Sequence, residues 1–296
     1  MTKKIRVALI QQRCMDVRQD NITTTIDAIN KAAAQGSELV LLQELHTSLY
    51  FCQTEDVAKF DLAETIPGPS TEIFSQVAKN LRVVIVTSIF EKRATGLYHN
   101  TAVVIDKDGI IAGCYRKMHI PDDPGYYEKF YFAPGDLGFK PVVTSVGKLG
   151  ILVCWDQWYP EAARLMALAG ADLLLYPTAI GWGTQESDED EKKRQRDAWI
   201  TIQRGHAISN GLPVLVANRV GFESATPQST QGIHFWGSSF VTGQQGEILA
   251  EGPIDQPAIV VTDINLNRNE TVRRGWPFLR DRRIESYHEI MRRHID

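Results

Sequence analysis

The chain of 296 residues has few cysteines and lacks the spacing that cysteines show in disulfide and zinc motifs. Its four cysteines, Cys14, Cys52, Cys114 and Cys154, are far apart, and no Cys-x-x-Cys pair occurs. This scarcity argues against both a disulfide framework and a structural zinc site. Scattered free cysteines are typical of proteins in a reducing compartment, so the sequence predicts a cytoplasmic location.

The sequence also lacks a large excess of charge of either sign. Its 36 acidic and 32 basic residues give a formal net charge of -4, so we expect no nucleic acid as a partner. No apolar run is long enough to span a bilayer, and no membrane partner is expected. The first residues lack the apolar region and cleavage site of a signal peptide, and 5–11 has the pattern of a first strand.

Nothing in the sequence divides the chain. There is no linker and no repeat at solenoid spacing, so we expect one domain over residues 1–296. A hydrophobic content of 43% is ordinary for a folded soluble protein with a sizeable core. Strand patterns alternate with helical ones, which predicts an α/β fold. The predicted strands are 5–11, 39–42, 83–90, 98–105, 110–116, 149–153, 172–177, 213–218, 237–242, 247–250 and 258–264, and the predicted helices are 21–35, 70–79, 160–169 and 197–209.

Cys154 follows a predicted buried strand, 149–153, and stands directly before a predicted helix. Pro160 is well placed in the first turn of that helix, and Gly170 in its end. The segment 149–177 therefore has the pattern of a β-α-β unit, and the strand ends of such units are where the sheet places its chemistry. By position alone, an inert core thiol and a reactive cysteine are equally good interpretations.

Three charged residues hold related positions. Glu44 follows the predicted strand 39–42, and Lys117 follows the second strand of a predicted hairpin. Glu128 lies in an aromatic loop, 121–136, which we expect to pack over a pocket. An unpaired carboxylate directly after a core strand is costly, which makes Glu44 notable. Taken singly, however, each of the three is as well or better interpreted as a solvated side chain.

Taken together, Glu44, Lys117 and Cys154, each at a strand end and in this order, resemble the nitrilase, or carbon–nitrogen hydrolase, superfamily. The matching segments are Leu-Gln-Glu-Leu at 42–45, Tyr-Arg-Lys-Met-His at 115–119, Gly-Ile-Leu-Val-Cys-Trp-Asp at 150–156 and Tyr-Pro-Glu at 159–161. Their order and their spread over much of the chain make the resemblance specific. It implies an α-β-β-α sandwich, in which two mixed sheets are flanked by helices.

The resemblance also implies a role for each residue. Cys154 would be the nucleophile and Glu44 the general base that takes its proton. Lys117, together with the backbone N–H of Trp155, would stabilise the negative oxygen of the tetrahedral intermediate. Glu128 would position Lys117 or the substrate. The family's chemistry requires no metal and no redox cofactor, so none is expected.

A narrower resemblance is to the N-carbamoylputrescine amidohydrolases within that superfamily. It rests on 119–132, on Tyr-Pro-Thr-Ala-Ile-Gly at 176–181 and on 276–283. It implies hydrolysis of N-carbamoylputrescine to putrescine, carbon dioxide and ammonia in polyamine synthesis. Asp156 follows Trp155 where nitrilases proper usually carry a glutamate, which disfavours nitrile hydrolysis.

Such a substrate is a cationic ureido compound, so we expect apolar walls and a distal acid in the pocket. The candidate substrate-binding residues are Tyr50, Trp155, Thr178 and Trp182. The candidate distal acids are Glu186, Asp188 and Asp122, and the sequence does not choose among them. An acidic segment at 186–191 suits a cationic substrate.

Three alternatives to this function stay open. One is a different ureido or amide substrate, such as a ureido acid, although an anionic substrate would favour arginine where 186–191 is acidic. The others are a nitrilase and a catalytically silent binding homologue. The family also implies a homo-oligomer, a dimer or larger. The tail, 271–296, carries seven arginines besides Trp276 and Phe278 and is predicted to dock on a partner subunit.

Overall fold

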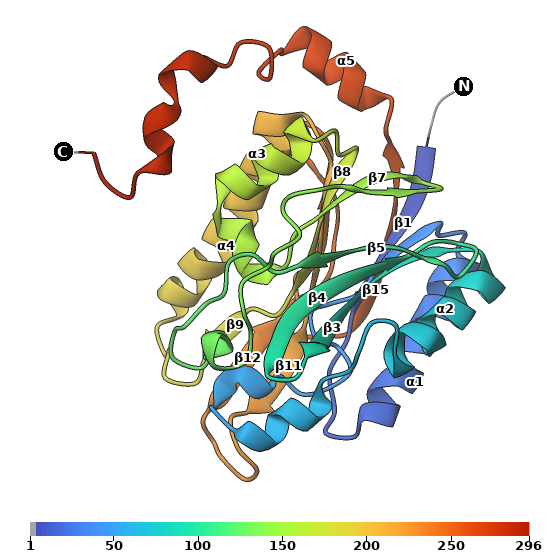
Figure 1. Ribbon diagram of the computed structural model, residues 1–296, viewed down its shortest axis with the longest axis vertical. Coiled ribbons are helices and arrows are strands. Elements are labelled where there is room, and N and C mark those ends of the chain that lie inside the picture. The colour runs from blue at the N-terminus through green and yellow to red at the C-terminus, as the bar shows by residue number, and fades with distance from the viewer. Residues whose placement is uncertain (1–3, 296) are drawn as a thin grey trace.

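Six strands form a first mixed sheet in the order β15-β1-β2-β3-β4-β5, within a computed structural model that describes residues 4–295 (Figure 1). The three central strands β1, β2 and β3 are parallel, and the outer three are antiparallel to their neighbours. Their bounds are β1 (Lys4–Gln11), β2 (Leu39–Leu41), β3 (Val84–Ala94), β4 (Leu97–Ile105), β5 (Ile111–Arg116) and β15 (Ala258–Asn265).

A second mixed sheet has the order β14-β13-β10-β8-β7-β6, again with three parallel central strands. Its strands are β6 (Val142–Thr144), β7 (Gly147–Ile151), β8 (Leu173–Thr178), β10 (Val214–Asn218), β13 (Phe240–Thr242) and β14 (Ile248–Glu251). Both predicted hairpins, β4–β5 and β13–β14, are confirmed.

A small third sheet, β11-β12-β9, was not predicted. Its strands are β9 (Gly181–Gly183), β11 (Val220–Ser224) and β12 (Gly232–Trp236). They are short and contain glycine, which weakens a strand pattern in sequence.

Successive side chains of a strand point to opposite faces of the sheet, and in these strands the side chains on both faces are apolar. One face of each large sheet therefore packs against the other sheet, and the opposite face packs against helices. Val7 and Leu9 of β1 belong to the core between the sheets, while Ala8 and Ile10 contact the helical layer on the outer face. The helices α1 (Arg18–Ala34) and α2 (Pro69–Leu81) cover the first sheet, and α3 (Pro160–Leu168) and α4 (Glu189–Asn210) cover the second (Figure 1). The predicted α-β-β-α sandwich is confirmed.

The helix starts differ most from the prediction. Helix α1 begins three residues before 21, and α4 begins eight residues before 197. In α4 the acidic segment is itself the first turn, where carboxylates interact favourably with the helix dipole. Asp188 is its N-cap and accepts a hydrogen bond from the backbone of Asp190 at 2.9 Å.

The chain ends in an arm that leaves the sandwich after α5 (Arg268–Gly275) and extends away from it (Figure 1). The predicted tail covers this arm, although residue 296 lies outside the described residues. Short 3₁₀ helices complete the chain, at Phe51–Gln53, Val57–Leu62, Glu128–Phe130, Cys154–Trp158, Ile284–Ser286 and His288–Met291. Within residues 4–295, no helix has the length and apolar character needed to cross a bilayer.

Candidate active site

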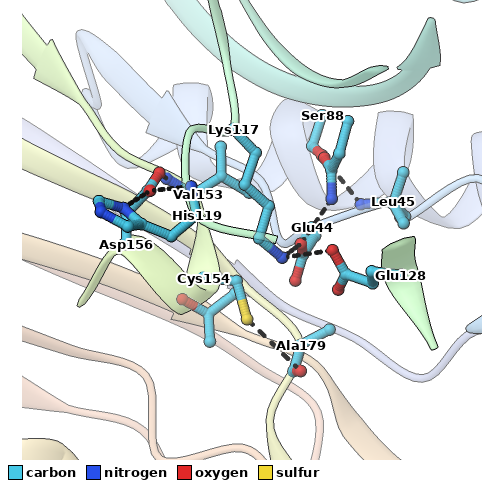
Figure 2. Close-up of polar contacts among 12 residues, drawn as sticks. Glu44, Leu45, Ser88, Lys117, His119, Glu128, Val153, Cys154, Asp156 and Ala179 are labelled. Atoms are coloured by element: carbon cyan, nitrogen blue, oxygen red, sulfur yellow. Dashed lines mark hydrogen bonds and ion pairs between the residues drawn. The ribbon is translucent and has the colours of Figure 1, made fainter. Parts of the chain in front are cut away.

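Lys117 lies at the centre of a fully buried cluster of charged side chains. Its Nζ is 2.8 Å from Oε1 of Glu44 and 2.7 Å from Oε2 of Glu128, and all three side chains are 0% exposed. Figure 2 shows the three side chains converging next to Cys154. Burial of unpaired charges costs several kcal/mol each, so these groups depend on one another for their ionised forms. The structure thus brings together the four predicted catalytic residues.

Glu44 uses its two carboxylate oxygens differently. Oε1 accepts hydrogen bonds from Lys117 and from Nδ2 of Asn100 at 2.7 Å. Oε2 is buried and has no hydrogen-bond partner among residues 4–295. The turn that carries Glu44 follows β2, and Leu45 has a φ of 47° there, with its N–H donating to Oγ of Ser88. One oxygen is therefore held in place, and the other is free to accept a proton.

Cys154 begins the 3₁₀ helix Cys154–Trp158 with a φ of 44°, in the left-handed region that non-glycine residues rarely adopt. Such strain persists only where surrounding contacts enforce it, and it is common at catalytic residues. Its Sγ lies 3.7 Å from the carbonyl oxygen of Ala179, and the residue is only 5% exposed (Figure 2).

Asp156 holds this strained turn. Its buried carboxylate accepts hydrogen bonds from the Val153 N–H at 2.9 Å, from the Tyr115 hydroxyl at 2.8 Å and from the backbone N–H of His119 at 3.0 Å. The sequence showed Asp156 only as part of a motif. Its role in holding the turn required the long-range contacts to Tyr115 and His119.

The environment sets the resting protonation of the cluster. Burial raises the pKa of the Cys154 thiol well above its usual value, and the Glu44 carboxylate raises it further. Burial also raises the pKa of Glu128, to about 7, against the opposing charge of Lys117. Burial lowers the pKa of Lys117, but the charges of Glu128 and Glu44 more than offset this, so its pKa is raised. The thiol is therefore neutral at rest and needs a base in the reaction itself.

Cys154 lines a cavity of about 1020 Å³. Aromatic and apolar walls and several charged groups surround the cavity, and they include Tyr126, Trp155, Trp158, Ile233, Trp236, Asp123, Glu186, Glu191 and Arg194. Within residues 4–295, no group of three or more His, Cys, Asp and Glu side chains is arranged to hold a metal ion.

The predicted substrate contacts are only partly placed at this cavity. Trp155 lines the cavity, and so does Glu186, one of the three candidate distal acids. In the described part of the chain, neither Asp122 nor Asp188 is in the lining, and Asp188 is instead the N-cap of α4.

In the described part of the chain, the other three predicted contacts lie outside the cavity lining. Tyr50 is buried behind the cluster, and its hydroxyl donates to Oε1 of Glu128 at 2.6 Å instead of forming a wall. Thr178 is buried at the end of β8 and donates to the carbonyl of Tyr176. Trp182 packs against Trp236, and its ring N–H donates to the carbonyl of Lys192.

Comparison with known proteins agrees with this geometry. The model of the carbon-nitrogen hydrolase family matches residues 6–274. The chain belongs to the carbon–nitrogen hydrolase family.

Relatives of this carbon–nitrogen hydrolase extend over nearly its whole length. N-carbamoylputrescine amidase of Oryza sativa is 41% identical over 97% of this chain and 95% of the rice protein. Citrullinase of Francisella tularensis is 40% identical over 98% of this chain and 99% of its own. The crystal structure of a carbon-nitrogen hydrolase from Helicobacter pylori G27 superposes with a TM-score of 0.95, at 54% identity, and covers 99% of this chain and 100% of that one.

Sequence reasoning missed several groups at the site of this carbon–nitrogen hydrolase. Asn100 lies in a buried strand with no pattern that marks it, yet it holds Glu44. Trp158, one turn after Cys154, and Trp236, from the small sheet, line the cavity. The aromatic loop 121–136 did signal a pocket, and it contributes several residues to the lining, Tyr126 and Asp123 among them.

Proposed function

We propose that this carbon–nitrogen hydrolase cleaves the ureido group of N-carbamoylputrescine and yields putrescine, carbon dioxide and ammonia. The observation that carries the proposal is the cavity, which joins the buried Cys154 to three acids, Asp123, Glu186 and Glu191, along walls rich in aromatic residues. A flexible four-carbon chain with an ammonium group at its far end fits such walls and such charges. The rice relative of that name supports the same substrate.

In the first half of the reaction, Oε2 of Glu44 takes the proton of the Cys154 thiol as sulfur attacks the ureido carbon. Because the thiol pKa is raised, proton transfer and attack belong to one step. An ammonium group has three N–H donors, and Glu44 and Glu128 accept two of those of Lys117. The third, with the Trp155 N–H, is left for the developing oxyanion.

The intermediate then collapses. The C–N bond to the terminal nitrogen breaks as Glu44 returns the proton to that nitrogen. Ammonia departs, and the rest of the substrate stays bound to Cys154 as a thioester. In the second half, Glu44 takes a proton from water as the oxygen attacks the thioester carbon. The C–S bond breaks, the proton returns to sulfur, and the released N-carboxyputrescine loses carbon dioxide.

The direct test is ammonia release from N-carbamoylputrescine by Cys154→Ala. We expect turnover to fall below detection while the folded state is retained, because the thiol is the only group that forms the covalent intermediate. Cys114→Ala, in a strand outside the cavity, is the matched control and should turn over within twofold of the wild type. Wild-type turnover by Cys154→Ala would refute the nucleophile assignment.

A ureido amino acid is the second candidate substrate, and Arg194 favours it. Arg194 lines the cavity beside Glu191, so an amino group and a carboxylate could both be paired there. The Francisella relative is a citrullinase. A panel of N-carbamoylputrescine, citrulline, a simple ureido acid, an amide and a nitrile separates the candidates by kcat/KM. No turnover of any, with Cys154 unreactive toward iodoacetamide, would favour a silent binding homologue.

The C-terminal arm supports a further part of the proposal, that residues 1–296 form one domain whose tail docks on a second copy of the chain. Trp276 is 54% exposed and Met291 88%, Phe278, Ile284 and Ile290 on the same arm are exposed as well, and exposed apolar side chains gathered in one region mark an interaction surface. Removal of residues 276–296 should lower the mass measured by light scattering to that of a smaller assembly. An unchanged mass would place the contact elsewhere.

A further inference from the structure

A buried ion pair outside the cavity contacts the turn that carries Glu44. Arg219 follows β10 directly and is fully buried, and its Nη1 donates to both carboxylate oxygens of Glu223, at 2.8 and 3.0 Å. The proposed reaction uses neither residue. Burial of a guanidinium is costly unless its donors are satisfied, so its other partners show what the pair does.

Those partners are backbone carbonyls of the catalytic turn. Nη2 of Arg219 donates to the carbonyl oxygens of Glu44 at 3.0 Å and of Leu45 at 2.8 Å, and Nη1 reaches that of Ser48 at 3.0 Å. Leu45 has a left-handed φ, so this turn is neither helix nor strand, and within residues 4–295 only one of these three carbonyls accepts a backbone hydrogen bond, that of Leu45 from the Ser48 N–H at 3.4 Å. The guanidinium supplies the missing donors.

The pair also joins the two sheets at the site. Arg219 continues a strand of the second sheet, which contains the strand that leads to Cys154, while Glu44 continues a strand of the first sheet. The contacts of Arg219 with the carbonyls of Glu44 and Leu45 therefore fix the general base relative to the sheet that carries the nucleophile.

Glu223 extends the same support to the second carboxylate. Its Oε2 accepts a hydrogen bond from the backbone N–H of Tyr50 at 2.6 Å, and the Tyr50 hydroxyl donates to Oε1 of Glu128 at 2.6 Å. The Arg219 guanidinium also lies over the Tyr50 ring, 5.9 Å from its centre. One buried ion pair is thus connected to Glu44 through the backbone and to Glu128 through Tyr50.

We propose that Arg219 and Glu223 are positioning residues, which together hold Glu44 and Glu128 in register with Lys117 and Cys154. The proposal rests on the proposed function only in that the reaction uses these carboxylates. Arg219 is suited to the task because its planar guanidinium can donate to several acceptors in a fixed geometry, which a lysine ammonium cannot do.

The test is Arg219→Lys, which retains the positive charge and loses the planar array of guanidinium N–H donors. We expect kcat to fall at least tenfold and KM to stay within twofold, because substrate binding at the cavity is unchanged while the base is displaced. The rate of Cys154 alkylation by iodoacetamide, followed by peptide mass, should fall by a similar factor. Arg18→Lys is the matched control, since Arg18 donates to Glu64 and Ser70 and touches no site residue.

Glu223→Gln is the second variant, and it tests the positioning role of the ion pair if Arg219→Lys does not fold. It should reduce kcat at least threefold and move the acid limb of the kcat profile to higher pH, because Tyr50 then holds the Glu128 carboxylate less well and the pKa of Glu128 rises further. A folded Arg219→Lys with wild-type kcat and alkylation, or a folded Glu223→Gln with wild-type kcat and pH profile, would overturn the proposal.

The alkylation rate makes the two proposals separable. It reports the activation of the thiol without any ureido substrate, so slow alkylation of Arg219→Lys supports the positioning role even if the substrate panel rejects N-carbamoylputrescine. Normal alkylation with full turnover of that substrate would refute the positioning role and leave the proposed function intact.

Discussion

The two ends of the cavity hold charge in opposite ways. At the Cys154 end, Lys117, Glu44 and Glu128 are completely buried, and each has partners from separate parts of the chain. At the rim, Arg194 and Glu191 have side chains that are 63% and 38% exposed, and they pair with each other one turn apart on α4. The charged side chains at the buried end are held in one geometry by their partners, whereas those at the rim are accessible to water and salt ions.

This difference separates the chemistry from the choice of substrate. Inside the protein the low dielectric strengthens every electrostatic interaction, and a misplaced charge is very costly. At the rim, ion pairs contribute about 1 kcal/mol or less and are screened by salt. Substitutions at the buried end should therefore abolish turnover, and those at the rim should adjust substrate affinity.

The largest expected effect is that of Lys117→Met. It removes an oxyanion donor and leaves two buried carboxylates without a cation, so kcat should fall about a thousandfold or more and the free energy of unfolding by about 3 kcal/mol. Ammonia release and urea unfolding at pH 8 measure the two effects. Lys117→Met with Glu128→Gln should recover part of the stability and none of the activity. Recovered activity would contradict the oxyanion role.

Glu128→Gln tests the buried end through pH. The folded pKa of Glu128, about 7, lies above its ordinary 4.5, so the folded state binds the proton more tightly than the unfolded state. Its contribution to stability is full below pH 4.5 and is lost as pH rises through 7, by at most about 3 kcal/mol. Urea unfolding at several pH values should show this decline in the wild type and a flatter curve in the variant. Parallel curves would contradict the burial effect.

A smaller effect is expected at the rim from Glu186→Gln. KM for N-carbamoylputrescine should rise about fivefold, because an ion pair with the distal ammonium worth about 1 kcal/mol is lost, and kcat should stay within twofold. Glu189→Gln is the matched control, since Glu189 has a side chain 83% exposed and is outside the cavity lining. Equal KM values for the two variants would mean that another acid binds the ammonium.

The smallest effect is that of salt on the unmodified protein. Between about 0.05 and 0.5 M NaCl, KM for a cationic substrate should rise two- to threefold, since the Debye length shortens across this range. The kcat value should not change, because the buried cluster is shielded from ions. A comparable fall in kcat would show that salt reaches the Cys154 end.

Much of this architecture could be predicted from local pattern, and the exceptions have physical reasons. Most strands of the two large sheets were predictable because their buried residues form apolar runs, whereas the three-residue strand β6 was not predicted. Glu44 and Cys154 stood out because each follows a buried apolar run, and Lys117 because it follows the second strand of a predicted hairpin. Trp155 and the aromatic loop 121–136 were expected at the pocket, whereas Trp158 and Trp236 were not, because they reach the cavity only through the tertiary fold. Tyr50 and Trp182 lie outside the lining, and the sequence alone could not show this, because an aromatic residue near a motif can either line a pocket or pack beside it.

The two oxygens of Glu44 have a consequence for which side chains this position tolerates. In Glu44→Gln, the amide oxygen would keep the bonds from Asn100 and Lys117, and the NH₂ group would then replace Oε2 beside the thiol. Such a substitution preserves the shape of the site while it exchanges an acceptor for a donor. Glu44→Asp keeps the charge but cannot reach both places at once. Length and charge are thus separate requirements at this position, and each is specified by a different oxygen of one carboxylate.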